Sequence, residues 1–118
     1  MYQLNKLFVG MLMVLSSNFV FGETWKCIVK NEREIYSKVD YVRVDDHFES
    51  YRNGSKVIGD DEIIMENDKE IILYYRGSSQ SFITILEKKY QTITTYGSTG
   101  EDPNKDIPPG FGDCQISE

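Results

Sequence analysis

The sequence predicts an all-β fold: an antiparallel meander curled into a small barrel or half-barrel, with one disulfide near the chain ends. Three observations predict it. Apolar residues recur with a period of two, the segments that carry them are rich in Ile, Val, Thr, Tyr and Phe, and turn signals separate these segments at short intervals. No stretch of ten or more residues has an amphipathic helical face with start and stop signals. Curling such a meander on itself removes its unpaired edges.

The alternation is clearest in three segments, Trp25–Val29, Ile71–Tyr75 and Tyr90–Tyr96. Asn53-Gly54 is the strongest turn signal, because a two-residue hairpin requires positive φ at both central residues. Strands are therefore expected at 24–30, 34–44, 47–52, 55–59, 62–66, 70–76, 80–87 and 90–96, with a last short strand around Cys114.

Residues 97–112 break this alternation. They hold four glycines and all three prolines of the chain, but only two large apolar side chains, Ile107 and Phe111. This composition predicts a long Gly/Pro-rich loop at 97–112 that lies across one rim of the sheet.

The first 22 residues are typical of a secretory signal peptide. Met1–Lys6 is polar with one lysine, Leu7–Phe21 is almost wholly apolar, and Gly22 is a small residue at the expected cleavage position. The apolar run is shorter than the roughly 20 residues that a spanning helix needs. We therefore expect residues 1–22 to be removed and residues 23–118 to form a single β domain. The protein would be exported to the bacterial periplasm or outside the cell, without stable membrane insertion.

The acidic balance of the chain bears on its partners. The segment 1–22 contains one lysine and no acidic residue, so its removal changes the net charge from −6 to −7. Nucleic acid and anionic lipid both require a positive surface, which argues against either as a partner. The charge instead favours a basic protein partner, with an association that weakens as salt rises. The sequence predicts no cofactor.

Cys27 and Cys114 are the two cysteines of the chain. An even pair in an exported protein predicts one disulfide, the alternative being two free thiols. The bridge would close almost the whole domain into one loop, which the chain-entropy model values at around 4 kcal/mol.

The stretch Phe48–Gly59 resembles a pattern in small exported bacterial proteins of unknown function. Gly77-Ser78, Phe82 and the terminal Gly112-Asp113-Cys114 extend the resemblance, as does Cys27 on the opening strand. The resemblance implies a small barrel-like fold and no assigned activity. The expected barrel is lipocalin-like, and its layout is also similar to that of c-type lysozyme inhibitors, which are small disulfide-closed barrels of the same compartment.

His47 is the only histidine and follows Asp45 and Asp46. It is a candidate general base or metal ligand, or else an exposed residue of a polar hairpin turn. Neighbouring strand residues point to opposite faces, so Asp46 approaches His47 only if a turn intervenes. Because no positioned partner is visible, the polar turn is favoured. The acidic run Asp60-Asp61-Glu62 is likewise interpreted as a charged turn rather than a metal site.

A calcium site is a weaker candidate. Asp102, Asn104 and Asp106 follow the spacing that begins a calcium loop, and Asp113 lies eleven residues after Asp102. The sixth position is Ile107 instead of glycine, and no helices are expected on either side. A solvated acidic loop is therefore the favoured interpretation, and no metal is predicted.

No catalytic constellation is visible, so the sequence favours a non-enzymatic protein-binding or inhibitory module. Its expected contact regions are the hairpin tip and the 97–112 loop, namely Asn53, Gly54, Asp102, Asn104, Asp106 and Phe111. The alternative is a carrier of a small apolar ligand in the barrel interior, for which a 96-residue domain leaves little room.

Overall fold

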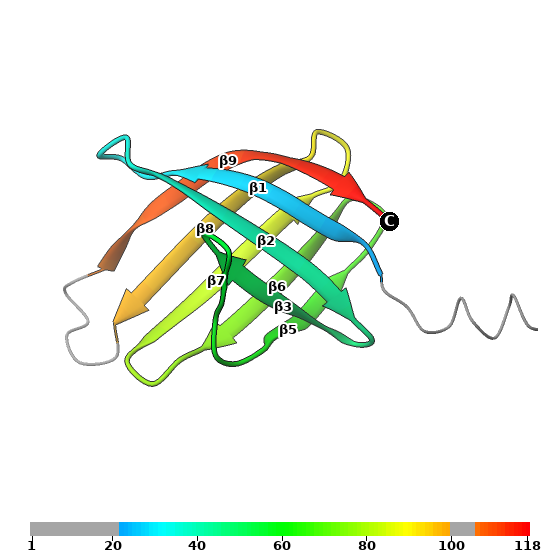
Figure 1. Ribbon diagram of the computed structural model, residues 1–118, viewed down its shortest axis with the longest axis horizontal. Helices are drawn as coiled ribbons and strands as arrows, with labels where there is room; N and C mark the ends of the chain where they lie inside the picture. Colours follow the sequence, from blue (N-terminus) through cyan, green and yellow to red (C-terminus); the bar gives the residue numbers. More distant parts are fainter. Residues whose placement is uncertain (1–21, 100–105) are drawn as a thin grey trace, which may run out of the picture.

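Nine antiparallel strands form one sheet that closes on itself (Figure 1). The computed structural model describes residues 22–99 and 106–118, so nearly all of the expected signal peptide lies outside the described residues. The strands are β1 (Thr24–Lys30), β2 (Tyr36–Val44), β3 (His47–Arg52), β4 (Ser55–Lys56), β5 (Asp61–Glu66), β6 (Glu70–Arg76), β7 (Gln80–Glu87), β8 (Thr92–Thr99) and β9 (Asp106–Ser117). No helix in the described part of the chain is long and apolar enough to cross a membrane.

The strand order defines a closed barrel. The sheet runs β2-β1-β9-β8-β7-β6-β5-β3-β4, and β2 also pairs with β3, so the first and last neighbours meet. The two-residue β4 only extends the β3 hairpin, which leaves eight strands in the barrel wall. Of the two architectures expected from the sequence, the closed barrel is confirmed.

The turn and strand chemistry explains these elements. Asn53 and Gly54 have φ of 51° and 90°, which confirms the predicted hairpin turn. Along β1, Trp25 and Cys27 are buried while Lys26 is exposed, as alternation in a barrel wall requires. Five strand ends among the first eight strands differ from the prediction: β2 begins at residue 36, β4 ends at residue 56, β5 begins at residue 61, and β8 runs from residue 92 to residue 99.

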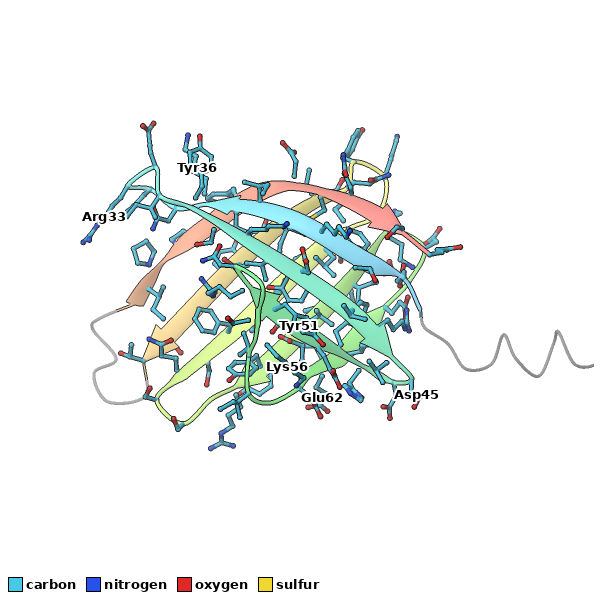
Figure 2. All side chains as sticks on the ribbon, viewed as in Figure 1. Arg33, Tyr36, Asp45, Tyr51, Lys56 and Glu62 are labelled. Atoms are coloured by element: carbon cyan, nitrogen blue, oxygen red, sulfur yellow. A yellow bond between two sulfur atoms is a disulfide. The ribbon has the colours of Figure 1, made fainter. Side chains whose placement is uncertain are left out.

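One half of the barrel interior is packed with apolar side chains. The buried core comprises Trp25, Cys27, Val39, Tyr41, Phe48, Ile71, Leu73, Leu86, Ile93 and Cys114. Most of them lie toward the end of the barrel that carries Asp45 in the β2–β3 turn, whereas Arg33 in the β1–β2 turn marks the opposite end (Figure 2). Full burial of each large apolar side chain contributes roughly 1.5–3 kcal/mol to folding.

The disulfide lies where the first strand meets the last. Cys27 in β1 is directly opposite Cys114 in β9, and the two sulfurs are bonded. The predicted pairing is therefore confirmed. The bridge spans a sequence separation of 87 residues and ties the two chain ends of the barrel wall together.

The predicted loop at 97–112 is wrong for most of its length. β8 continues to Thr99 and β9 begins at Asp106, so only residues 100–105 lie outside both strands and outside the described residues. A bulge between the positions opposite Thr95 and Gly97 accommodates the Pro108-Pro109 pair, which has no backbone N–H to donate. The pairing of β9 with β1 starts only at Phe111, beyond these prolines.

Gly112 has a close-packing role instead of a loop role. Its position in β9 faces Val29 of β1 and Ile93 of β8. A Cβ at this position would overlap the backbone carbonyl of Ile28, so only glycine lets the two strands approach this closely.

Charged side chains gather at the packed end of the barrel. The Arg43 guanidinium donates hydrogen bonds of 3.0 and 2.6 Å to the two carboxylate oxygens of Glu66, and one of 2.8 Å to Glu23. It also lies 5.5 Å from the centre of the Phe48 ring. The paired hydrogen bonds from Arg43 hold the pKa of Glu66 below its usual value. Arg43 of β2 thus links the end of β5, at Glu66, with the residue before β1, Glu23.

Replacing Arg43 by alanine is expected to lower the free energy of unfolding by about 1–2 kcal/mol, because two partly buried carboxylates lose their cation and the Phe48 ring is uncovered. Urea denaturation of the oxidised protein measures this change. Arg33→Ala is the matched control: Arg33 is exposed in the β1–β2 turn, and its loss is expected to change stability by less than about 0.5 kcal/mol. Equal losses for the two variants would contradict the role assigned to Arg43.

Candidate functional site

The other half of the barrel interior is hollow. A cavity of about 540 Å³ lies there, between the packed core and the barrel end that carries the β1–β2 and β6–β7 turns. Figure 1 shows these two turns at the same end of the barrel. Its lining residues come from β1, β2, β3, β5, β6, β7, β8, β9 and the turns at that end. Many of its inward-facing side chains are small, including Ser37, Ser50, Thr84, Thr95 and Gly110. Because these side chains are small, they leave this half of the barrel interior unfilled, whereas larger apolar side chains fill the other half.

Polar groups lie where the cavity meets the core. The Tyr41 hydroxyl is 3.5 Å from the Thr84 hydroxyl, and both residues are buried. Burial raises the pKa of Tyr41 to about 12, and the negative charge of Asp61 acts in the same direction. The Tyr41 hydroxyl therefore stays protonated at neutral pH and is available as a neutral hydrogen-bonding group.

Asp61 is the charged residue of this region. It begins β5 opposite Phe48, lines the cavity, and is only 3% exposed. Burial raises its pKa to about 6, and a hydrogen bond with Ser50 opposes that rise only in part. At neutral pH the carboxylate is mostly ionised within the barrel wall.

One oxygen of this carboxylate, Oδ2 of Asp61, is buried and has no hydrogen-bond partner. Within the described residues, two other buried side-chain atoms share this property, Nε1 of Trp25 and Oδ1 of Asp40. Neither of those residues lines the cavity. A buried polar group without a partner usually costs stability, and each instance calls for an explanation. For Asp61 the adjoining cavity supplies one.

Aromatic rings form another part of the cavity wall. The Tyr75 hydroxyl donates a 2.6 Å hydrogen bond to the carbonyl oxygen of Ile58, which holds its ring in place. The ring of Phe82 lies 6.3 Å from that of Tyr75, tilted by 42°. Together with Tyr41 these rings give the cavity a rigid aromatic and apolar surface around a single buried carboxylate.

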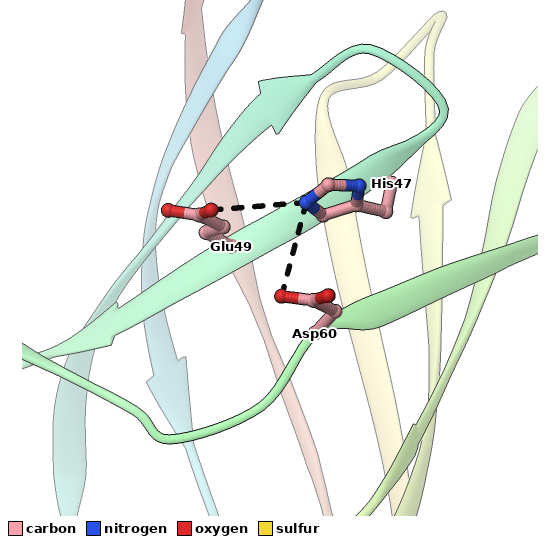
Figure 3. A group of neighbouring side chains, drawn as sticks. All are labelled: His47, Glu49 and Asp60. Carbon is pink, nitrogen blue, oxygen red and sulfur yellow. Dashed lines mark ion pairs between the residues drawn. The ribbon is translucent and has the colours of Figure 1, made fainter.

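His47 lies outside the cavity, on the outer face of β3. Its Nε2 is 3.7 Å from Glu49 and 3.8 Å from Asp60, and its Nδ1 is 3.2 Å from Asp46 (Figure 3 shows the first two). Glu49 shares the face because it is two residues further along the strand. The β2–β3 turn brings Asp46 alongside. Sequence reasoning considered Asp46 as a partner only if a turn intervened and did not find Glu49 or Asp60, although the two-residue spacing of His47 and Glu49 was a usable signal.

Nε2 of His47 and the carboxylates of Glu49 and Asp60 could together hold a divalent ion. A protonated imidazole neutralises the same carboxylates. Burial lowers the pKa of His47, but the carboxylates of Asp46, Asp60 and Glu49 raise it by more, so its pKa lies above the usual value. When protonated, the imidazole pairs with Asp60 and so links β3 to the connection before β5, where these strands pair at only two positions.

The predicted contact and calcium residues are dispersed. Asn53 is exposed, but its side-chain oxygen accepts the backbone N–H of Lys38, so it secures the hairpin to β2, and Gly54 is the exposed residue beside it. Phe111 and Asp113 are exposed in β9, in the barrel wall rather than in a loop. Of the remaining residues, Asp102 and Asn104 lie outside the described residues, and Asp106 begins β9.

Asp61 was missed as a site residue because it was interpreted as part of a charged turn. It starts a strand instead, and the alternation in β5 places it inside with Ile63 while Glu62 points outward. Residues two apart in a strand face the same side, so Asp61 lies on the same face as the apolar Ile63. An acidic residue on the apolar face of a strand was the signal that could have found it.

No protein-family model matches the chain, and no curated protein or solved structure matches it either. The resemblances to small exported barrels and to c-type lysozyme inhibitors therefore stay predictions. What the barrel can do has to be inferred from its cavity.

Proposed function

We propose that this protein is a non-enzymatic carrier that binds one small, largely apolar molecule inside its barrel. The observation that carries the proposal is the half-filled interior, with a cavity of about 540 Å³. Small-molecule sites commonly have volumes of roughly 300–1,000 Å³, with mostly apolar walls and a few placed polar groups. The cavity has a volume in this range, and its wall combines aliphatic and aromatic side chains with polar groups such as Ser50, Thr84 and Asp61.

The division of the interior supports this function. The packed half, with Trp25, Phe48 and Leu86, supplies the buried core of the fold. The hollow half, with Ser37 and Thr95, does not fill the barrel as the core does. An apolar ligand would replace the missing side-chain contacts there, because an unfilled apolar space loses dispersion contacts on one side.

The interior also fits the observations better than the surface regions predicted from the sequence. The hairpin tip at Asn53 is used to anchor β2, and most of the expected contact loop is barrel wall. A basic protein partner remains a prediction of the net charge. Binding to a basic protein requires no cavity, so this function leaves the hollow half of the barrel without an explanation.

Filling part of the cavity is expected to weaken binding. The neutral fluorescent probe N-phenyl-1-naphthylamine should bind the wild-type protein with an increase in emission. Thr95→Leu places a larger side chain in the cavity and should weaken binding roughly tenfold or more, a loss of about 1.4 kcal/mol or greater. The matched control is Thr94→Leu, the adjacent residue of β8 on the outer face, which should change the dissociation constant less than about twofold. Absence of saturable binding by the wild type would refute the proposal.

A further inference from the structure

We infer that the ligand of this cavity carries a protonated amine, which pairs with Asp61 while the rest of the ligand lies against the aromatic wall. The inference rests on the proposed function and adds the chemical class of the ligand: a small organic cation with an apolar or aromatic body.

The first support is the state of the Asp61 carboxylate. Its Oδ2 is buried and has no hydrogen-bond partner, and the residue, which is only 3% exposed, is one of those that line the cavity. A buried carboxylate is normally paired or coordinated, because an isolated buried charge is costly. An ammonium group has three N–H donors and a full positive charge, so one such group supplies the missing hydrogen bond and adds a counter-charge to the attraction that His47 provides.

The second support is the aromatic lining. The faces or edges of Tyr41, Tyr75 and Phe82 all contribute to the cavity wall. Cations are attracted to aromatic faces within about 6 Å of the ring centre, and the attraction is larger where water is excluded. The hydrogen bond from Tyr75 to Ile58 holds one of these rings ready for contact.

The third support is the sign of the surrounding charge. The chain has a net charge of −6, and Asp60 adds a further carboxylate next to Asp61. A negative protein raises the local concentration of cationic ligands and disfavours anionic ones. Fatty acids and other carboxylates would instead place a second negative charge beside Asp61.

Arg52 is the one competing cation of the cavity lining. It is exposed at the end of β3, and in the described part of the chain no ion pair joins it to Asp61. If Arg52 were the true partner of Asp61, removing its charge would strengthen amine binding markedly. We expect Arg52→Gln to change amine affinity by less than about threefold, since an amine already reaches Asp61.

Three ligands of nearly equal shape test the inference: 2-phenylethylamine, 2-phenylethanol and 3-phenylpropanoate. Titration calorimetry at pH 7.5 on the oxidised, leaderless protein gives each affinity. The amine is expected to bind about tenfold to a hundredfold more tightly than the alcohol, and the carboxylate more weakly than both. Asp61→Asn should remove the preference for the amine and leave the affinity for the alcohol within about threefold.

Asp40→Asn is the matched control. Asp40 is the other carboxylate with a buried, partnerless oxygen, but it does not line the cavity. The same charge is lost in both variants, so an equal effect of Asp40→Asn would overturn the inference in favour of general electrostatic attraction. Equal binding of amine and alcohol to the wild type would also overturn it, while leaving the carrier function intact. Failure of all three ligands, together with failure of the neutral probe, would refute the carrier function itself.

Discussion

Reduction of the Cys27–Cys114 disulfide is expected to lower the free energy of unfolding by about 4–5 kcal/mol. The two cysteines are 87 residues apart, and the loop entropy of an unfolded chain grows with the length that a cross-link closes. Small domains have total stabilities of roughly 5–15 kcal/mol, so this loss is a large part of the total. At the lower end of that range the reduced protein would be close to its unfolding midpoint.

Urea denaturation with and without a reductant measures the effect. Reduction converts the S–S bond into two thiols and leaves the rest of the chain unchanged. The unfolded reduced chain is less compact, so the denaturant dependence of the unfolding free energy should also become steeper. The double variant Cys27→Ala/Cys114→Ala is the control for the buried sulfurs: it should lose at least as much stability as reduction does. A loss below about 1 kcal/mol on reduction would show that the β1–β9 ladder holds the barrel closed without the bridge.

Asp61→Asn is expected to stabilise the ligand-free protein by about 3 kcal/mol at pH 7.5. Burial raises the pKa of Asp61 from 3.8 to about 6, so the folded protein holds this proton more tightly than the unfolded chain does. Stability from this group is therefore fully present below pH 3.8 and is lost as the pH rises through about 6. Asparagine has no proton to lose and avoids that loss.

The pH dependence separates this explanation from a simple packing effect. The difference between the Asp61→Asn variant and the wild type should be about 3 kcal/mol at pH 7.5, about 1 kcal/mol at pH 4.5, and near zero below pH 3.8. Urea denaturation at each pH with EDTA present gives the values without interference from divalent ions. A difference that is constant with pH would contradict ionisation of a buried Asp61. A residue that lowers stability yet lies at a cavity is typical of a binding site.

Much of the barrel was predictable from local patterns. The two-residue alternation and the turn signals together located eight strands, Asn53-Gly54 located one hairpin, and the cysteine count predicted the bridge that the fold contains. These signals are local or compositional, so they do not depend on how the sheet curls. The error at 97–112 came from the same rules, since glycine and proline are loop residues in most contexts.

The candidate site was not predictable in the same way. Asp61 lies in an acidic run that has every property of a surface turn, and its inward direction depends on where β5 begins. Thr95 and Ser37 are ordinary strand residues until the barrel places them across one cavity. His47, Glu49 and Asp60 meet only because β3 pairs with β5 after an intervening hairpin.

The sequence by itself determined that this chain forms antiparallel strands, where most of them turn, and which two sulfurs bond, because backbone preferences and side-chain alternation act between near neighbours. Only the tertiary structure decided that the sheet closes completely, that glycines and prolines of the last strand belong to its wall, and that half of the interior stays hollow around a buried carboxylate. The reason is that the width of a closed barrel depends on all its strands together, and whether it is filled depends on side chains that are far apart in the chain.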